Sequence, residues 1–397
     1  FSITAGTVKT LLGRPYHVPS AYFPHGVYLE VAAKIKKRLR VPMLYAGRIV
    51  HPREAEAALA KGFTDLVGMT RAIIADPEMP RKASSGRLAE IRPCVGANEG
   101  CIGRLYQGLP IECVHNPAIG RERELAAIIP AHNARRVVVV GAGPAGLESA
   151  RMAALRGHGV TLLERGDRTG GQVRVAALAP GRGEITGIVD WLDSECRRLG
   201  VEIMLGVNAR PDGVLAMSPD AVIVATGSAP RPLPNSVRAG ASVVDVRAAM
   251  QGAPLGKRVV VYAEDPLTAG PTCADLLVSQ GHEVVVVAPQ YVVGEMIDDT
   301  QKPIILRRLL QAGVTLLPLH RAVSFEAHHV VVEHVLTGAR SEIHADSAVV
   351  AAAARAEHEL ADALRGRIAE LHVVGDAVTP RRVHEAILEG TRAARAV

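Results

Sequence analysis

The chain has 397 residues, of which 48% are apolar and 22% charged, so it is long enough for two or three domains that each bury a core. The formal net charge is +6, but the lysines and arginines are scattered. No basic run is interleaved with aromatic residues, so we expect no nucleic acid partner, and the charge better suits an acidic cofactor or redox partner. No apolar run has membrane-spanning length and no signal peptide is recognisable, so we expect a cytoplasmic protein without a membrane contact.

The first ninety residues alternate short apolar strands with helices. A strand-like stretch at 41–47 precedes a helical pattern at 51–62, and a second strand-like stretch follows at 64–70. This order predicts parallel strands that are buried on both faces. Two or three such units do not close a sheet alone, so residues 1–90 are predicted to be the C-terminal part of a (β/α)8 barrel. Because the chain starts at Phe1 inside a strand-like stretch, we expect a fragment or a processed piece.

Glycine and arginine follow both of these strands. Gly47-Arg48 ends the first, and Gly68 with Thr70-Arg71 ends the second. Each arginine alone would be interpreted as surface charge. At neighbouring strand ends, however, backbone amides and two guanidinium groups together predict a phosphate clamp.

Residues 91–130 are predicted to form a cysteine-rich loop and linker. Cys94, Cys101 and Cys113 lie close together in a chain with five cysteines. An odd number of cysteines in a long chain disfavours a disulfide scaffold and favours a metal or redox role. A purely structural loop is the alternative, because metal sites built from cysteine usually have four ligands. Lone histidines such as His115 are interpreted as surface or loop residues.

A glycine-rich turn follows the apolar strand at 137–140 and opens a helix. Gly141, Gly143 and Gly146 have the G-x-G-x-x-G spacing, in which the glycines allow a tight turn, a close pyrophosphate and close helix packing. Glu164 ends the next strand, where a carboxylate would bind a ribose hydroxyl. The predicted dinucleotide site comprises Gly141, Gly143, Pro144, Ala145, Gly146, Glu164 and Arg165.

Three later segments extend this site. Gly171 and Gln172 lie in a second glycine turn, Thr226-Gly227 follows a buried strand, and Gly375-Asp376 lies between a strand and a helix. Asp376 is placed to bind a ribityl or phosphate-proximal hydroxyl. Each segment alone could be an ordinary strand-end turn, but their order after the first glycine turn favours a flavin site.

A second strand-helix-strand unit at 257–290 repeats the pattern with a degenerate loop. Only Gly270 remains of the glycines, and Glu264 and Asp265 put negative charge where a pyrophosphate would lie. A retained fold without a nucleotide and an NAD(P) site both stay open. The predicted fold is α/β, with the barrel part followed by two nested Rossmann-like domains. The FAD-binding domain covers 131–255 and 351–397, and the NAD(P)-like domain covers 256–350.

These motifs together resemble the family of 2,4-dienoyl-CoA reductase and trimethylamine dehydrogenase, in which an FMN-binding barrel is fused to an FAD/NAD(P) domain. The resemblance implies that Gly47, Arg48, Gly68, Thr70 and Arg71 bind the FMN phosphate and that the segments from Gly141 to Asp376 bind FAD or ADP. It also implies a [4Fe-4S] cluster in the cysteine loop. Cys94, Cys101 and Cys113 are in register with three of its ligands, but Ala97 occupies the position of the second. A cluster with water or another ligand on one iron and a three-iron form both stay open.

The resemblance implies a flavin-dependent oxidoreductase that passes electrons between a substrate-side FMN, an iron–sulfur centre and FAD. Two reactions on a small molecule stay open: NAD(P)H-dependent reduction of an enoate or dienoyl thioester C=C, and oxidative N-demethylation of a small amine. No catalytic residue is named, because the family's acid/base residues lie in earlier barrel strands. The alternative is a non-catalytic electron-transfer or FAD-binding subunit completed by a partner chain. Expected partners are an electron-transfer protein or a complementary barrel-containing chain, in a homo- or hetero-oligomer.

Overall fold

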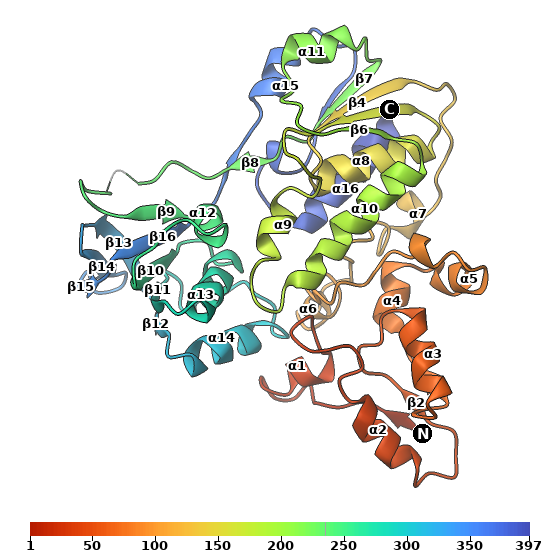
Figure 1. The fold of residues 1–397 in the computed structure, drawn as a ribbon, viewed down its shortest axis with the longest axis horizontal. Coiled ribbons are helices and arrows are strands. Elements are labelled where there is room, and N and C mark those ends of the chain that lie inside the picture. The colour runs from red at the N-terminus through yellow and green to blue at the C-terminus, as the bar shows by residue number, and fades with distance from the viewer. Residues whose placement is uncertain (235) are drawn as a thin grey trace. The chain divides into compact units, whose positions relative to one another are not determined.

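The computed structural model describes residues 1–234 and 236–397, which divide into two compact units (Figure 1). The first unit contains residues 1–174, 184–228 and 356–397. The second contains residues 175–183 and 229–355. The second unit is therefore inserted into the first along the sequence.

The N-terminal part of the first unit is a parallel three-stranded sheet with helices between its strands. β1 (Ser2–Ile3) pairs with β2 (Leu44–Tyr45), which pairs with β3 (Leu66–Val67). The helical elements are α1 (Arg14–His17), α2 (Leu29–Lys36), α3 (Pro52–Ala60), α4 (Thr70–Ala75), α5 (Met79–Ser84) and the 3-10 turn η1 (Leu88–Glu90). The side chains of Met43 and Tyr45 are fully buried against alanines of α2 and α3. The strands and helices thus alternate as predicted.

A five-stranded parallel sheet forms the larger part of the first unit. Its order is β18-β7-β4-β5-β6, with β4 (Arg136–Val140), β5 (Gly159–Leu163), β6 (Glu202–Met204), β7 (Ala221–Val224) and β18 (Leu371–Val373). The valines of β4 are buried on both faces, as expected for a central parallel strand. β4, the strand of this sheet that comes first in the sequence, is therefore central, as in a nucleotide-binding α/β fold.

Helices cover both faces of this sheet. On one face α8 (Pro144–Leu155) packs against α10 (Thr186–Arg198) and α16 (Val383–Ala396), which lie side by side in Figure 1. On the other face α11 (Pro211–Ala216) and α15 (Glu359–Leu364) contribute to a second apolar cluster. Short helical elements complete this unit and its connections: α6 (Ile102–Leu105), α7 (Glu122–Leu125), α9 (Gln172–Ala176), η2 (Gly183–Ile185) and η3 (Gly375–Ala377).

The second unit repeats the order of four of these strands and differs at one edge, where its first strand in sequence takes the place of the last. Its parallel sheet runs β12-β11-β10-β16-β9, with β9 (Val243–Asp245), β10 (Arg258–Ala263), β11 (Glu283–Val287), β12 (Thr315–Leu317) and β16 (Ser347–Ala351). Its helices are α12 (Val246–Met250), α13 (Ala269–Ser279) and α14 (Lys302–Gln311). The strand-helix-strand echo in the sequence therefore corresponds to four strands of equivalent topology in each parallel sheet. β9 joins this sheet although it precedes residue 256, where the sequence predicts that the domain begins.

An antiparallel sheet completes the second unit. It contains β13 (His320–Phe325), β14 (His329–His334) and β15 (Arg340–His344). The chain passes between the units at β8 (Ser228–Ala229) and β17 (Arg355–Ala356). Among the residues described, no helix combines the length and the apolar character needed to cross a lipid bilayer.

Candidate flavin-binding site

The turn between β4 and α8 can be built only with glycine at two positions. Gly141 has φ 101°, and a Cβ atom there would lie 2.3 Å from the carbonyl oxygen of Ala225. A Cβ atom on Gly146 would lie 1.8 Å from the carbonyl oxygen of Gly141. Both contacts are with backbone atoms that side-chain rotation cannot relieve. These two glycines are therefore required by the turn itself, with or without a bound molecule.

Gly143 differs, because the surrounding protein leaves space beside it. A Cβ atom on Gly143 would meet nothing within 4 Å. Gly143 is the N-cap of α8 and provides no side-chain cap, and Pro144 occupies the first turn. The N-terminal amides of a helix carry a partial positive charge and bind anions. Gly143 thus leaves room for a phosphate where α8 can bind it.

The carboxylate of Glu164 holds the glycine turn in place. One oxygen accepts a hydrogen bond from the backbone N–H of Ala142 at 2.7 Å, and the other accepts one from Gly166 at 2.7 Å. Each oxygen keeps a further lone pair for a ribose hydroxyl. The neighbouring Arg165 is exposed and pairs with Glu357 at 3.2 Å.

The second glycine turn lies directly against the first. The N–H of Gly170 donates to the carbonyl of Ala142 at 2.8 Å. A Cβ atom on Gly171, whose φ is 52°, would lie 3.2 Å from the Cα atom of Gly143. The two turns predicted separately from the sequence therefore form one wall.

The carboxylate of Asp376 is held by groups from three segments. Its Oδ2 accepts hydrogen bonds from Ser228 Oγ at 3.0 Å and from Gln172 Nε2 at 3.4 Å, and its Oδ1 accepts one from the backbone N–H of Arg381 at 3.1 Å. Gly375, with φ 66°, donates its N–H to Glu389 at 2.8 Å. Ser228 was not predicted, and only its position directly after the glycine turn could have indicated it.

Two glycines place these segments beside α8. A Cβ atom on Gly375 would lie 2.8 Å from the Cβ atom of Ala145. Gly227 has φ 81°, and the hydroxyl of Thr226 donates to the carbonyl of Glu357. The structure therefore brings the predicted dinucleotide residues of both halves of the first unit together at the C-terminal ends of parallel strands, where ligands bind in open α/β sheets.

The two arginines of the barrel part form hydrogen bonds within the protein. Arg48 is buried at φ 58°, and it donates from Nη1 to the carbonyl of Phe23 at 2.5 Å and from Nη2 to Glu184 at 2.6 Å. Its buried Nε has no hydrogen-bond partner among the residues described. Gly47 contacts the same strand, since a Cβ atom there would lie 2.2 Å from the hydroxyl of Tyr45.

Arg71 lies at the next strand end, just after Gly68 and Thr70, where α4 begins. Its Nη1 donates to the carbonyl of Pro19 at 2.7 Å and to the side-chain oxygen of Asn98 at 2.8 Å. Burial lowers the pKa of Arg71, and the neighbouring Cys94 and Cys101 act in the opposite direction. Arg71 therefore links the end of β3 to the cysteine loop.

The cysteine loop is held by its own hydrogen bonds. Cys101 Sγ lies 3.6 Å from the carbonyl of Asn98, and the N–H of His115 donates to Cys113 Sγ at 3.4 Å. Burial raises the pKa of Cys101 to about 11 and also raises the pKa of Cys113. The side chain of Ala97 packs against the apolar core of the five-stranded parallel sheet of the first unit, β18-β7-β4-β5-β6 (the FAD-type sheet).

These residues do not provide the donor set of a closed four-iron cluster. The cysteines are free thiols, and no group of three cysteine, histidine or carboxylate side chains in the described part of the chain is arranged to hold a metal ion. A methyl group at Ala97 cannot replace the fourth thiolate. We therefore assign no reaction step to a cluster.

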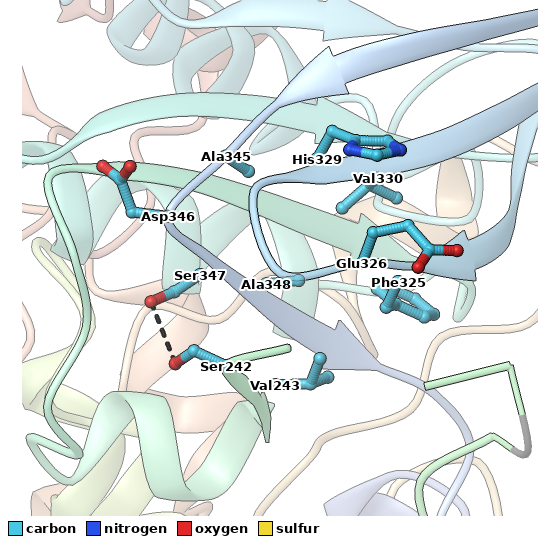
Figure 2. Close-up of a pocket in the computed structure, with 10 residues that line it drawn as sticks. All are labelled: Ser242, Val243, Phe325, Glu326, His329, Val330, Ala345, Asp346, Ser347 and Ala348. Atoms are coloured by element: carbon cyan, nitrogen blue, oxygen red, sulfur yellow. Dashed lines mark hydrogen bonds between the residues drawn. The ribbon is translucent and has the colours of Figure 1, made fainter. Parts of the chain in front are cut away.

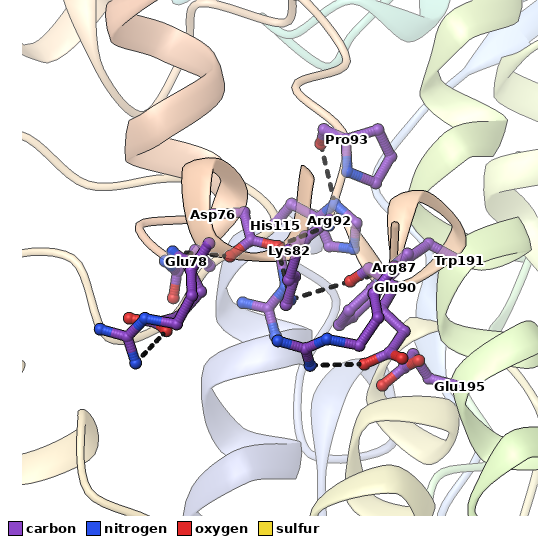
Figure 3. Close-up of polar contacts among 12 residues, drawn as sticks. Asp76, Glu78, Lys82, Arg87, Glu90, Arg92, Pro93, His115, Trp191 and Glu195 are labelled. Atoms are coloured by element: carbon purple, nitrogen blue, oxygen red, sulfur yellow. Dashed lines mark hydrogen bonds and ion pairs between the residues drawn. The ribbon is translucent and has the colours of Figure 1, made fainter. Parts of the chain in front are cut away.

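The loop joins the FAD-type sheet through Trp191 of α10 (Figure 3). The guanidinium carbon of Arg92 lies 4.5 Å from the centroid of the indole ring, and Nε1 of Trp191 donates to the carbonyl of Glu90 at 3.2 Å. Burial lowers the pKa of Arg92 to about 10. The prediction that His115 is a surface or loop residue is wrong in placing it at the surface. His115 is 1% exposed, because its ring packs edge-on against Trp191 at 5.1 Å.

In the second unit, the two carboxylates of the degenerate loop already form hydrogen bonds within the protein. Arg231 donates from Nη2 to both carboxylate oxygens of Glu264, at 2.7 and 2.8 Å. Asp265 accepts a hydrogen bond from the N–H of Leu267 at 2.7 Å. Both carboxylates thus lie between β10 and α13, where a nucleotide pyrophosphate would experience repulsion.

A depression between β9, β14 and β16 is the pocket shown in Figure 2. Its free space of about 180 Å³ includes open solvent, and the depression leaves no enclosed room for a water-sized molecule. Two of its polar residues pair with each other, since Ser347 donates to Ser242 at 3.1 Å. We assign it no ligand.

Comparison with known proteins assigns two parts of the chain to two families. Residues 135–390 match the pyridine nucleotide-disulphide oxidoreductase family, and residues 18–90 match the NADH:flavin oxidoreductase / NADH oxidase family. The chain is 38% identical over 365 residues to N,N-dimethylglycine/sarcosine dehydrogenase of Chromohalobacter salexigens, covering 88% of this chain and 52% of that protein. It is 32% identical over 396 residues to the metal reductase of Desulforamulus reducens, covering 92% of this chain and 59% of that protein. A solved structure of 2-naphthoyl-CoA reductase superimposes with a TM-score of 0.91 and 29% identity, covering 100% of this chain and 60% of that one.

This chain spans little more than half the length of these relatives. The similarity confirms the predicted fold class, in which a late part of an FMN-type barrel precedes two nested nucleotide-binding folds. It also confirms the resemblance found in the motifs. The chain therefore belongs to the pyridine nucleotide-disulphide oxidoreductase family, joined at its N-terminal side to a segment of the NADH:flavin oxidoreductase / NADH oxidase family, as in 2,4-dienoyl-CoA reductase and trimethylamine dehydrogenase.

Proposed function

We propose that the first unit binds FAD and that the chain is the FAD-bearing part of a flavin-dependent oxidoreductase acting on a small molecule. The observation that supports this is the convergence of Gly143, Glu164, Gly171 and Asp376 around the N-terminus of α8. Bound flavin supplies hydride and single-electron transfer. The chain's own residues bind and orient it.

Each of these groups suits one part of the cofactor. The N-terminal amides of α8 and the space at Gly143 accept the pyrophosphate. Glu164 keeps lone pairs for a ribose hydroxyl, and Asp376 keeps a lone pair on Oδ1 for a hydroxyl of the ribityl chain. The barrel part adds Arg48 and Arg71, which we propose as the cationic side of an FMN phosphate site.

We further propose that the whole protein oxidises an N-methylated amine and passes electrons to a protein carrier. The relative at 38% identity is named for dimethylglycine and sarcosine oxidation, and Glu264 and Asp265 disfavour a pyrophosphate in the second unit. Reduction of a conjugated C=C is the second candidate, because 2-naphthoyl-CoA reductase shares the fold over this whole chain.

The test is anaerobic reconstitution of the purified chain with FAD and with FMN, followed by absorption spectra, identification of the released flavin, and titration with NADH. We expect one FAD per chain and no reduction of the flavin by NADH. A chain that retains no flavin after reconstitution contradicts the proposed function. Rapid reduction by NADH would instead assign a nicotinamide site to the second unit and favour the reductase.

A further inference from the structure

The carboxylate of Asp376 is fixed before any ligand binds. Its two oxygens are held from opposite sides, Oδ1 by the backbone N–H of Arg381 and Oδ2 by the hydroxyl of Ser228. Arg381 in turn pairs with Glu389, which accepts the N–H of Gly375. The backbone before and after the carboxylate is therefore also restrained.

Ser228 connects two segments that are distant in sequence. Its hydroxyl accepts a hydrogen bond from Gln172 Nε2 at 2.9 Å and donates to Asp376 Oδ2 at 3.0 Å, across 148 positions. Ser228 is 4% exposed, whereas Gln172 lies at the surface. A buried hydroxyl that both accepts and donates fixes the direction of its own proton, so the hydrogen bonds polarise one another.

The two ends of the predicted site differ in whether they can distinguish FAD from ADP. The helix terminus and glycine turns are placed to contact only groups that ADP and FAD would share, namely the pyrophosphate and the adenosine ribose. Asp376 lies in the separate group formed by η3 and the turn after β7. Only the ribityl half of FAD offers additional hydroxyls to a carboxylate.

We propose that Ser228, supported by Gln172, is the positioning residue that fixes Asp376 for the ribityl chain and so makes the site select FAD over ADP. This inference rests on the proposed FAD site. A carboxylate already held in one orientation loses less rotational freedom on binding, which raises the affinity for the ligand that uses it. The affinity for ADP does not depend on this group.

The experiment measures dissociation constants of FAD, by quenching of flavin fluorescence, and of ADP, by calorimetry, for the whole chain. In the wild type we expect FAD to bind at least about tenfold more tightly than ADP, as hydrogen bonds to a charged group allow. Ser228→Ala should weaken FAD binding by about tenfold and leave ADP binding unchanged within roughly twofold. Ser228→Thr retains the hydroxyl and should restore FAD affinity.

Gln172→Ala provides the second variant, because this exposed side chain can be removed without a cavity. It should weaken FAD binding by about threefold without affecting ADP. Equal losses for both ligands in Ser228→Ala, or no loss for FAD, would overturn the inference. A wild type that binds ADP as tightly as FAD would also overturn it, while a wild type that binds neither contradicts the proposed function itself.

Discussion

The guanidinium of Arg48 donates to the carboxylate of Glu184 across 2.6 Å, although the two residues are 136 positions apart. Arg48 follows a strand of the barrel part, and Glu184 precedes α10 of the FAD-type fold. The imidazole of His25 extends this contact, with Nε2 3.2 Å from Glu184 and Nδ1 2.5 Å from Glu54. The side chain of a strained, left-handed Arg48 is thus held by a charged network.

Stability should depend on pH through this network. Hydrogen bonds to Glu184 and Glu54 raise the pKa of His25 to about 9 from a usual value of 6.5. Burial acts to raise the pKa of Glu184, but His25 and Arg48 hold it below its usual value, so the carboxylate stays charged. Because the folded pKa of His25 is raised, its contribution is fully present below pH 6.5 and is lost as pH rises through 9.

The measurement is the melting temperature of the wild type and His25→Gln between pH 6 and 10. The difference between them should be largest near pH 6 and should vanish above pH 9. His358→Gln is the matched control, since His358 forms an exposed pair with Asp362 at 3.5 Å. An equal difference between wild type and His25→Gln at every pH would refute this prediction.

Gly143→Asp should strongly weaken FAD binding without unfolding the protein. Aspartate is a favoured N-cap residue and a Cβ atom at Gly143 meets nothing within 4 Å, so α8 should form normally. The new carboxylate repels the pyrophosphate, and we expect the dissociation constant for FAD to rise on the order of 100-fold. Gly143→Ser is the uncharged control and should lose much less affinity for FAD. Flavin titration with parallel circular dichroism decides the outcome, and unchanged FAD affinity in the aspartate variant would place the pyrophosphate elsewhere.

Trp191→Ala should be among the more destabilising single substitutions. Trp191 is 7% exposed, contacts Arg92 and His115 from the cysteine loop, and lies 5.3 Å from the guanidinium carbon of Arg151 on α8. Removing the ring leaves a cavity beside charged groups, and we expect the free energy of unfolding to fall by about 3–5 kcal/mol. Trp191→Phe keeps an aromatic ring and should lower the free energy of unfolding by a smaller amount. Urea unfolding followed by circular dichroism measures both, and a loss below about 1 kcal/mol for the alanine variant would contradict the prediction that Trp191 holds the cysteine loop in place.

The amount of iron that the purified chain binds should depend on the side chain at position 97. With three cysteines and a methyl group at the position of the second ligand, we expect the purified chain to contain no four-iron cluster after anaerobic reconstitution with iron and sulfide. Ala97→Cys should raise iron and acid-labile sulfide toward about four of each per chain. Ala97→Ser is the matched control of similar size. Four irons with a cubane signature in the wild type would disprove the prediction.

Several features could be predicted from the sequence because they depend on few residues. The main features of the first glycine turn lie within about thirty positions of one another. They are the strand at 137–140, the glycines that permit positive φ and close backbone contact, and the carboxylate at the end of the next strand. Their spacing is constrained by the geometry of one strand-turn-helix-strand unit. The repeated unit in the second fold and the nested order follow from the same local pattern.

Other features were decided only by tertiary structure. Ser228 and Asp376 are 148 positions apart, and Arg48 and Glu184 are 136 apart, so no local period or turn rule connects them. His115 has the sequence context of a loop, yet the single tryptophan of the chain buries it. A sequence motif specifies which groups can bind a cofactor, because backbone geometry acts over short distances. Which side chains orient those groups, and with what charge, depends on contacts that exist only after distant segments have packed together.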